Sequence, residues 1–231
     1  MPKRKWDDVS LAAMQAIITM LVEDHAVAAI QGEPDSVVDL GCGTGSVLEK
    51  VVDKFTGIRA VAVDKDLSQF GLGELSNVQT TKCDLAQGTG LPDSSFELVL
   101  LCGSLEFNDN LGVAAILGEA NRIAAPGARI VIQVTHRDHD RARQQLLRKG
   151  DIVPSGEAIR AWGEGPYGWY HLREDGEYAR LIAKEFAVVN PEVLRVSDCP
   201  ETLEYFEEYC GYPGFSLNSG LSETFVCRSK H

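Results

Sequence analysis

Three alternating glycines stand between an apolar stretch and a helical pattern in the segment 37–45, which reads Val-Val-Asp-Leu-Gly-Cys-Gly-Thr-Gly. Glycine lets the backbone approach a ligand closely, and the first N–H groups of the following helix have no partners inside that helix. A turn of this kind favours binding of an anionic or nucleotide-like ligand. The alternative is a purely structural tight turn.

Two carboxylates accompany the glycines. Asp39 lies two residues before Gly41, and Asp64 ends the next apolar stretch, about 20 residues after the last glycine, which is the offset of a ribose-binding acid. Asp66 is the alternative to Asp64, although an Asp at that place also caps helices. A dinucleotide is the main rival ligand, but Ser46 stands where the fingerprint Gly-x-Gly-x-x-Gly needs its third glycine. Asp39 would repel a pyrophosphate and suits the ammonium of S-adenosylmethionine.

Strand and helix patterns alternate along the chain and place these residues at strand ends. Strands are predicted at 36–40, 59–63, 78–82, 96–101, 128–134, 188–196 and 222–228. Helices are predicted at 7–30 (one helix or two), 46–55, 67–72, 113–123, 175–186 and 200–209. This order predicts a doubly wound parallel sheet, whose ligand crevice lies outside the carboxyl ends of the strands.

The segment 36–134 resembles the class I S-adenosylmethionine-dependent methyltransferases, in particular their small-molecule group. The glycine motif matches residue for residue, and further similarity lies in 62–64, 82–85, 91–99 and 119–130. The resemblance implies an α/β, Rossmann-like three-layer sandwich with a seven-stranded, mostly parallel sheet and an antiparallel last strand at 222–228. We expect a single domain, 1–231, with an N-terminal helical cap at about 7–30 and an inserted lid at about 136–172.

The resemblance also implies the residues that contact the methyl donor. It assigns Asp84 to the adenine amino group, Leu85 to the ring, and the backbone of Cys102 and Gly103 to the methionine end. The cofactor-binding residues expected are Asp39, Gly41, Cys42, Gly43, Gly45, Asp64, Lys65, Asp84, Leu85 and Cys102. The cofactor expected is S-adenosyl-L-methionine, with S-adenosyl-L-homocysteine as the product.

Candidate residues for the methyl acceptor follow the fourth and fifth strands. His136 is the first choice for a catalytic base, because it comes directly after the fifth strand; His139, His171 and Glu106 are weaker candidates, and Glu106 could instead face solvent. For four aromatic residues the sequence leaves two alternatives, an apolar wall for an acceptor or packing of the lid on the core: Trp162, Tyr167, Trp169 and Tyr170.

The charge of the chain restricts its partners. The 22 basic and 34 acidic residues give a net charge of −12, which disfavours DNA, so we expect a small-molecule acceptor and a monomer or homodimer. No apolar run is long enough to span a membrane, and the charged start lacks the apolar stretch of a secretory signal, so a cytoplasmic protein with free thiols is expected. No residue spacing demands a metal. Open alternatives are a protein or tRNA methyltransferase and a non-catalytic S-adenosylmethionine-binding partner subunit.

Overall fold

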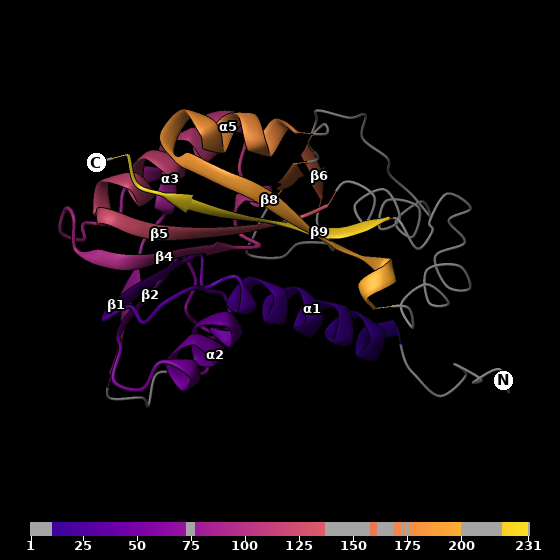
Figure 1. Ribbon diagram of the computed structural model, residues 1–231, viewed down its shortest axis with the longest axis horizontal. Helices are drawn as coiled ribbons and strands as arrows, with labels where there is room; N and C mark the ends of the chain where they lie inside the picture. Colours follow the sequence, from indigo (N-terminus) through magenta and orange to yellow (C-terminus); the bar gives the residue numbers. More distant parts are fainter. Residues whose placement is uncertain are drawn as a thin grey trace, which may run out of the picture.

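The computed structural model describes residues 11–72, 77–136, 158–160, 169–171, 173, 176–199 and 219–230. Within these residues, seven strands form one sheet in the order β3-β2-β1-β4-β5-β9-β8 (Figure 1). They are β1 (Ser36–Leu40), β2 (Arg59–Asp64), β3 (Val78–Lys82), β4 (Phe96–Cys102), β5 (Ala124–Thr135), β8 (Ala187–Arg195) and β9 (Gly220–Arg228). β9 is antiparallel to both β5 and β8, and the other pairs are parallel. The Rossmann-like fold with an antiparallel last strand is therefore confirmed.

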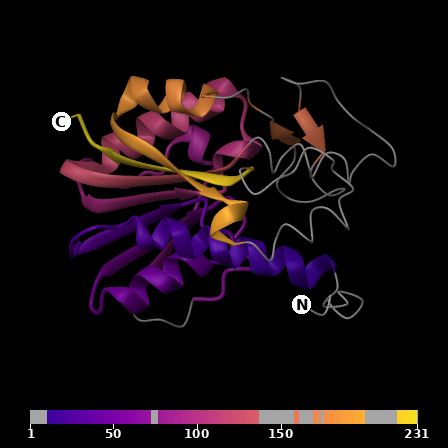
Figure 2. The same cartoon turned by 45° about the vertical axis from the view of Figure 1, so that its right-hand side comes forward.

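Helices cover both faces of the sheet. α1 (Leu11–Ala28) and α2 (Ser46–Lys54) lie on one face, and α3 (Asn110–Ile123) and α5 (Glu177–Glu185) lie on the other (Figures 1 and 2). Successive side chains of a strand point to opposite faces, so Val37 joins the apolar cluster under α2 while Val38 joins the one under α3. Every residue of β1 is buried, which explains why its apolar residues do not alternate with exposed polar ones.

Short elements lie between the main ones. Three 3-10 helices are present in the described residues, η2 (Leu85–Gln87), η3 (Leu105–Phe107) and η4 (Val196–Asp198). β6 (Ala158–Arg160) and β7 (Trp169–His171) form a separate antiparallel pair, and β7 contacts η3 at the end of β4. In the described part of the chain, no helix combines the length and apolar character that crossing a membrane requires.

The helix predicted at 67–72 is absent. The carboxylate of Asp66 accepts a hydrogen bond from the Ser68 N–H (3.0 Å), and the Phe70 N–H donates to the Leu67 carbonyl (3.2 Å), so the segment forms a single turn. The Gly71 N–H donates to the Thr44 carbonyl (3.0 Å), and Leu72 is buried. Because the Gly71 N–H bonds to the loop after β1, it does not bond to the Leu67 carbonyl four residues earlier, as an α-helix would require.

The boundary between α3 and β5 also differs from the prediction. The sequence Ala125-Pro126-Gly127 was expected to separate a helix from a strand at 128, but α3 ends at Ile123 and β5 begins at Ala124. Ala124 pairs with Phe96, and the register then shifts, so the proline falls in an irregular part of the strand that tolerates a missing N–H. The N-terminal pattern at 7–30 contains one helix over its described part, and the helix predicted at 200–209 lies outside the described residues.

Candidate functional site

The glycine turn after β1 has room for a ligand at its middle position. Gly41, Gly43 and Gly45 all have left-handed backbone angles, with φ of 83°, 52° and 88°. A Cβ atom at Gly41 would lie 2.4 Å from Ser104 Cβ, and one at Gly45 would lie 2.7 Å from the ring of Phe70. No atom lies within 4 Å of the corresponding place at Gly43. The outer two glycines are therefore required by packing, whereas Gly43 borders open space.

Asp39 is a buried carboxylate without a matching cation. It is 2% exposed, and its Oδ1 has no hydrogen-bond partner among the described residues. Burial and, to a smaller extent, the negative charges of Asp64 and Glu23 together raise its pKa to about 7. A cationic group at this position, such as the ammonium of S-adenosylmethionine, would stabilise the charged carboxylate.

Asp64 holds the glycine turn against the end of β2. Its Oδ2 accepts a hydrogen bond from the Gly43 N–H (2.9 Å), and its Oδ1 accepts one from the Asp66 N–H (3.0 Å). Each carboxylate oxygen has a second lone pair, so these bonds leave Asp64 able to accept from a ligand hydroxyl. Asp64 is 5% exposed, whereas Lys65 beside it is exposed.

α1 contributes an acid that the sequence analysis did not single out. The hydroxyl of Ser46, at the start of α2, donates to Glu23 Oε1 (2.5 Å), and Lys50 Nζ lies 3.2 Å from Glu23 Oε2. Asp39, Asp64 and Glu23 thus gather at the carboxyl ends of β1 and β2, with Lys50 beside Glu23. No motif marks Glu23, because its proximity depends on how α1 packs on α2.

The remaining predicted cofactor residues lie at the same edge of the sheet. Asp84 is exposed and accepts a hydrogen bond from the Ala86 N–H (3.0 Å) as the cap of η2, and Leu85 packs on the core below. Burial raises the pKa of the Cys42 and Cys102 thiols, so both remain protonated. Their thiols are unsuited to nucleophilic chemistry, which fits positions that act through the backbone.

Glu106 is buried and does not face solvent, contrary to one sequence-based reading. Its side chain is 2% exposed, and Oε1 accepts hydrogen bonds from the Thr135 N–H (2.8 Å) and hydroxyl (3.2 Å). Oε2 has no partner in the described part of the chain. Burial raises the pKa of Glu106, while the Thr135 hydrogen bonds and the charge of Arg173 act in the opposite direction.

Arg173 holds the segment after η3 in place. Its guanidinium is 8% exposed and donates to the Asn108 carbonyl (2.5 Å), the Asn110 side chain (3.1 Å) and the Tyr178 hydroxyl (2.9 Å). A buried cation with three acceptors fixes the connection between β4 and α3. Sequence reasoning missed it, because nothing in its local pattern marks a buried arginine.

His136 lies at the carboxyl end of β5, as predicted, and three residues of β9 contact it or lie beside it. Its N–H donates to the Leu221 carbonyl (3.1 Å), and its Nε2 lies 3.6 Å from Glu223 Oε1. A Cβ atom at position 220 would lie 2.4 Å from the imidazole, so only glycine leaves space for the ring. Glu223 and Gly220 were missed, although a charge within an otherwise apolar strand is a weak signal.

Several acceptor candidates cannot be placed. His139, Trp162 and Tyr167 lie outside the described residues. Trp169, Tyr170 and His171 belong to β7, of which the structure describes only the backbone. Among the described residues, no group of three or more His, Cys, Asp or Glu side chains has the arrangement of a metal site, and five cysteines are free thiols.

Known proteins share the sequence features and the fold of this chain. A family model described as a methyltransferase domain matches residues 13–184. This chain belongs to that methyltransferase family. The family and the fold together confirm the resemblance to class I S-adenosylmethionine-dependent methyltransferases and the methyl donor that it implies.

One curated relative of the methyltransferase is a probable chloroplastic tocopherol O-methyltransferase from Oryza sativa subsp. japonica. The two are 31% identical over 144 residues, which make up 57% of this chain and 39% of the relative. The match thus spans about two fifths of the length of that curated protein.

Solved structures share the fold of the methyltransferase at low identity. The PH0226 protein from Pyrococcus horikoshii OT3 has a TM-score of 0.68 and 17% identity, with 96% of this chain and 94% of that one covered. The 1,6-didemethyltoxoflavin-N1-methyltransferase from Burkholderia thailandensis, solved with its substrate and S-adenosylhomocysteine, has a TM-score of 0.58 and 17% identity, with 98% and 81% covered. These structures support the architecture of the sheet and its helices.

Proposed function

We propose that this methyltransferase transfers the methyl group of S-adenosylmethionine to an O, N or C atom of a small-molecule acceptor. The observation that carries the proposal is Asp39, a buried carboxylate whose Oδ1 has no partner among the described residues and which lies four residues before the open backbone position at Gly43. A cation is the ligand that this carboxylate accommodates best, which favours S-adenosylmethionine over an anionic dinucleotide. The similarity to a probable tocopherol O-methyltransferase supports a small-molecule acceptor.

The residues at the carboxyl ends of the strands have separate parts in the proposal. Asp39 and the backbone of Cys102 face the methionine end, Asp64 accepts the ribose hydroxyl protons, and Asp84 with Leu85 holds the adenine. Gly41, Cys42, Gly43 and Gly45 bring the backbone close to the donor, and Lys65 lies beside Asp64. S-adenosylmethionine supplies the methyl group and a sulfonium leaving group when bound.

His136 is proposed as the group that receives the acceptor's proton. The carboxylate of Glu223, 3.6 Å from Nε2, orients the ring. Methyl transfer needs in-line approach, so holding the acceptor still contributes more than proton removal when the acceptor is already a nucleophile. The contact of β7 with η3 supports an acceptor wall that includes Trp169 and Tyr170, with Trp162 and Tyr167 in the same segment.

Labelled S-adenosylmethionine tests the acceptor class. The protein is incubated with a fractionated metabolite extract and, separately, with cell lysate before and after nuclease or protease treatment. We expect label in small molecules; label found only in protein or tRNA would overturn the small-molecule proposal while leaving the methyltransferase activity intact.

His136→Gln and Glu223→Gln separate a base from a structural pair. If His136 receives a proton, both substitutions lower kcat and change its pH profile while the Kd of S-adenosylhomocysteine stays the same. Glu97→Gln, on a strand of the same sheet, is the matched control for Glu223→Gln. Unchanged kcat across pH in His136→Gln would exclude the proposed role.

A further inference from the structure

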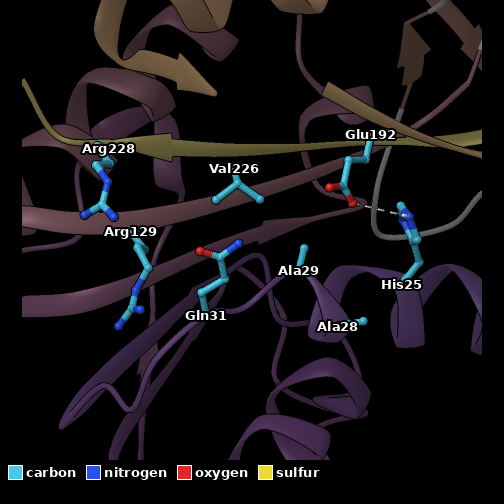
Figure 3. A pocket seen from close by; sticks show the side chains of 8 residues that line it. All are labelled: His25, Ala28, Ala29, Gln31, Arg129, Glu192, Val226 and Arg228. Atoms are coloured by element: carbon cyan, nitrogen blue, oxygen red, sulfur yellow. Dashed lines mark ion pairs between the residues drawn. The ribbon is translucent and has the colours of Figure 1, made fainter. Parts of the chain in front are cut away.

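A second cavity lies between the C-terminal turn of α1 and the sheet, away from the glycine turn (Figure 3). Its volume is about 220 Å³, and its lining comes from α1 with the residues after it and from β5, β8 and β9: His25, Ala28, Ala29, Gln31, Arg129, Glu192, Val226 and Arg228. Arg129 pairs with Leu98, four residues before Cys102, so it lies about 13 Å from the carboxyl end of β4 along the strand. The cavity is therefore separate from the proposed cofactor site.

Two arginines oppose each other in this cavity. Arg129 of β5 and Arg228 of β9 are direct partners in the antiparallel register. Side chains of such partners point to the same face, with Cβ atoms about 4.5–5.5 Å apart, and like charges in this arrangement destabilise the sheet. Figure 3 shows both guanidinium groups at one end of the cavity, with the Gln31 side chain beside them.

Neither arginine forms an ion pair within the described residues. Arg228 Nη1 donates weakly to the Gly127 carbonyl (3.4 Å), and Arg129 lies against Gly32, where a Cβ atom would be 2.5 Å from Nη1. The acid of the cavity, Glu192, lies instead 3.9 Å from His25 Nε2, with its side chain 66% exposed. Arg228 is exposed and Arg129 is half-buried, so water screens part of their mutual repulsion, and an anion bound between them would reduce it further.

We propose that this cavity binds a phosphate group through Arg129 and Arg228. The planar guanidinium presents paired N–H donors that match the oxygens of a phosphate, and the Gln31 amide offers a further donor. The cavity is smaller than the roughly 300–1,000 Å³ of pockets that enclose drug-sized ligands, so it accommodates the phosphate group and leaves the rest of a phosphorylated metabolite outside. Free phosphate and a phosphate monoester share this chemistry.

The test is calorimetry on the full chain in phosphate-free buffer, with inorganic phosphate and glycerol 3-phosphate as probes and chloride as the ionic-strength control. We expect saturable binding of at least one probe at one site. Arg129→Gln and Arg228→Gln should each weaken it by at least about tenfold, as loss of a charged hydrogen bond predicts. Arg180→Gln, on the opposite face of the sheet, should bind as tightly as the unsubstituted protein.

Thermal unfolding gives a second, independent readout. Without phosphate, Arg129→Gln and Arg228→Gln should keep or raise Tm, because they remove repulsion between opposed charges. With phosphate, the unsubstituted protein should gain Tm and both variants should not. The proposal is overturned if neither probe binds saturably, or if both variants bind them as tightly as the unsubstituted protein. The Kd of S-adenosylhomocysteine, unaffected by these substitutions, keeps this result distinct from the proposed methyl transfer.

Discussion

The substitution Asp39→Asn tests whether the carboxylate near the end of β1 binds a cationic ligand. Burial, and then the charges of Asp64 and Glu23, raises the pKa of Asp39 from 3.8 to about 7. The folded state therefore holds the Asp39 proton more tightly than the unfolded chain does. Above pH 7 the group is charged in both states, and its burial costs roughly 4 kcal/mol, by the usual 1.36 kcal/mol per pKa unit. This cost decreases as the pH falls toward 3.8 and disappears below it.

The substitution should therefore stabilise the ligand-free protein at high pH. With about 2–4 °C of Tm for each kcal/mol in a chain of this size, Asp39→Asn is expected to raise Tm by several degrees at pH 8 and by less at pH 5. Differential scanning calorimetry at the two pH values measures the difference. Asp35→Asn, an exposed aspartate just before the opposite end of β1, is the matched control and should leave Tm unchanged at both.

Cofactor binding should respond in the opposite direction. The ammonium of S-adenosylmethionine favours charged Asp39, so binding below pH 7 must release its proton, and Kd should rise by up to about tenfold for each pH unit between 7 and 5. Asp39→Asn should bind about 10- to 150-fold more weakly at pH 8, with a Kd that is flat over this range. Titration calorimetry in buffers of different protonation enthalpy counts the protons released. A flat Kd and no proton release in the unsubstituted protein would refute the role of Asp39.

Four further predictions concern the site and its support. Asp64→Asn should weaken S-adenosylhomocysteine binding by about 1–3 kcal/mol in calorimetry, through loss of a charged acceptor; unchanged Kd would exclude Asp64 from the ribose. Glu106→Gln, which retains an oxygen for the Thr135 N–H, should lower kcat with unchanged cofactor Kd if the unpartnered Oε2 serves the acceptor, and equal kcat would assign Glu106 to structure alone. Gly43→Ala should lower cofactor affinity and cost about 1–2 kcal/mol of stability, whereas Gly45→Ala should destabilise the protein more, because its Cβ would meet the Phe70 ring. Urea unfolding measures both losses, and a larger loss of stability in Gly43→Ala than in Gly45→Ala would contradict the packing argument. Hydrogen bonds from Arg122 and then Thr89 lower the pKa of Glu119 to about 2, so the stabilisation that they give is present above pH 4.5 and lost as the pH falls through 2. Glu119→Gln should therefore lower the free energy of unfolding by about 1–2 kcal/mol at pH 7 and by progressively less below pH 4.5. A difference in unfolding free energy that stays constant with pH would contradict this pH dependence.

The sequence predicted the sheet well because its signals are local. The parallel strands β1 and β4 are buried over most of their length and mainly apolar, and glycines with left-handed φ mark the turn after β1. The helix at 67–72 was wrong because its apolar spacing gave no sign that the Asp66 carboxylate and the Thr44 carbonyl hold its N–H groups. The order of α3 and β5 was right, but their boundary depended on pairing of Ala124 with Phe96.

The sequence by itself determined the family, the donor and the chain positions of Asp39 and Asp64, since each depends on residues close together in the chain. Tertiary structure alone decided which groups meet at the strand ends. Glu23 reaches Ser46 because α1 packs on α2, and Glu223 reaches His136 because β9 inserts beside β5. The raised pKa of Asp39 is likewise a property of the fold, because burial and neighbouring charges produce it. Contacts between residues far apart in the chain leave no local pattern, and the choice of base and of acceptor depends on them.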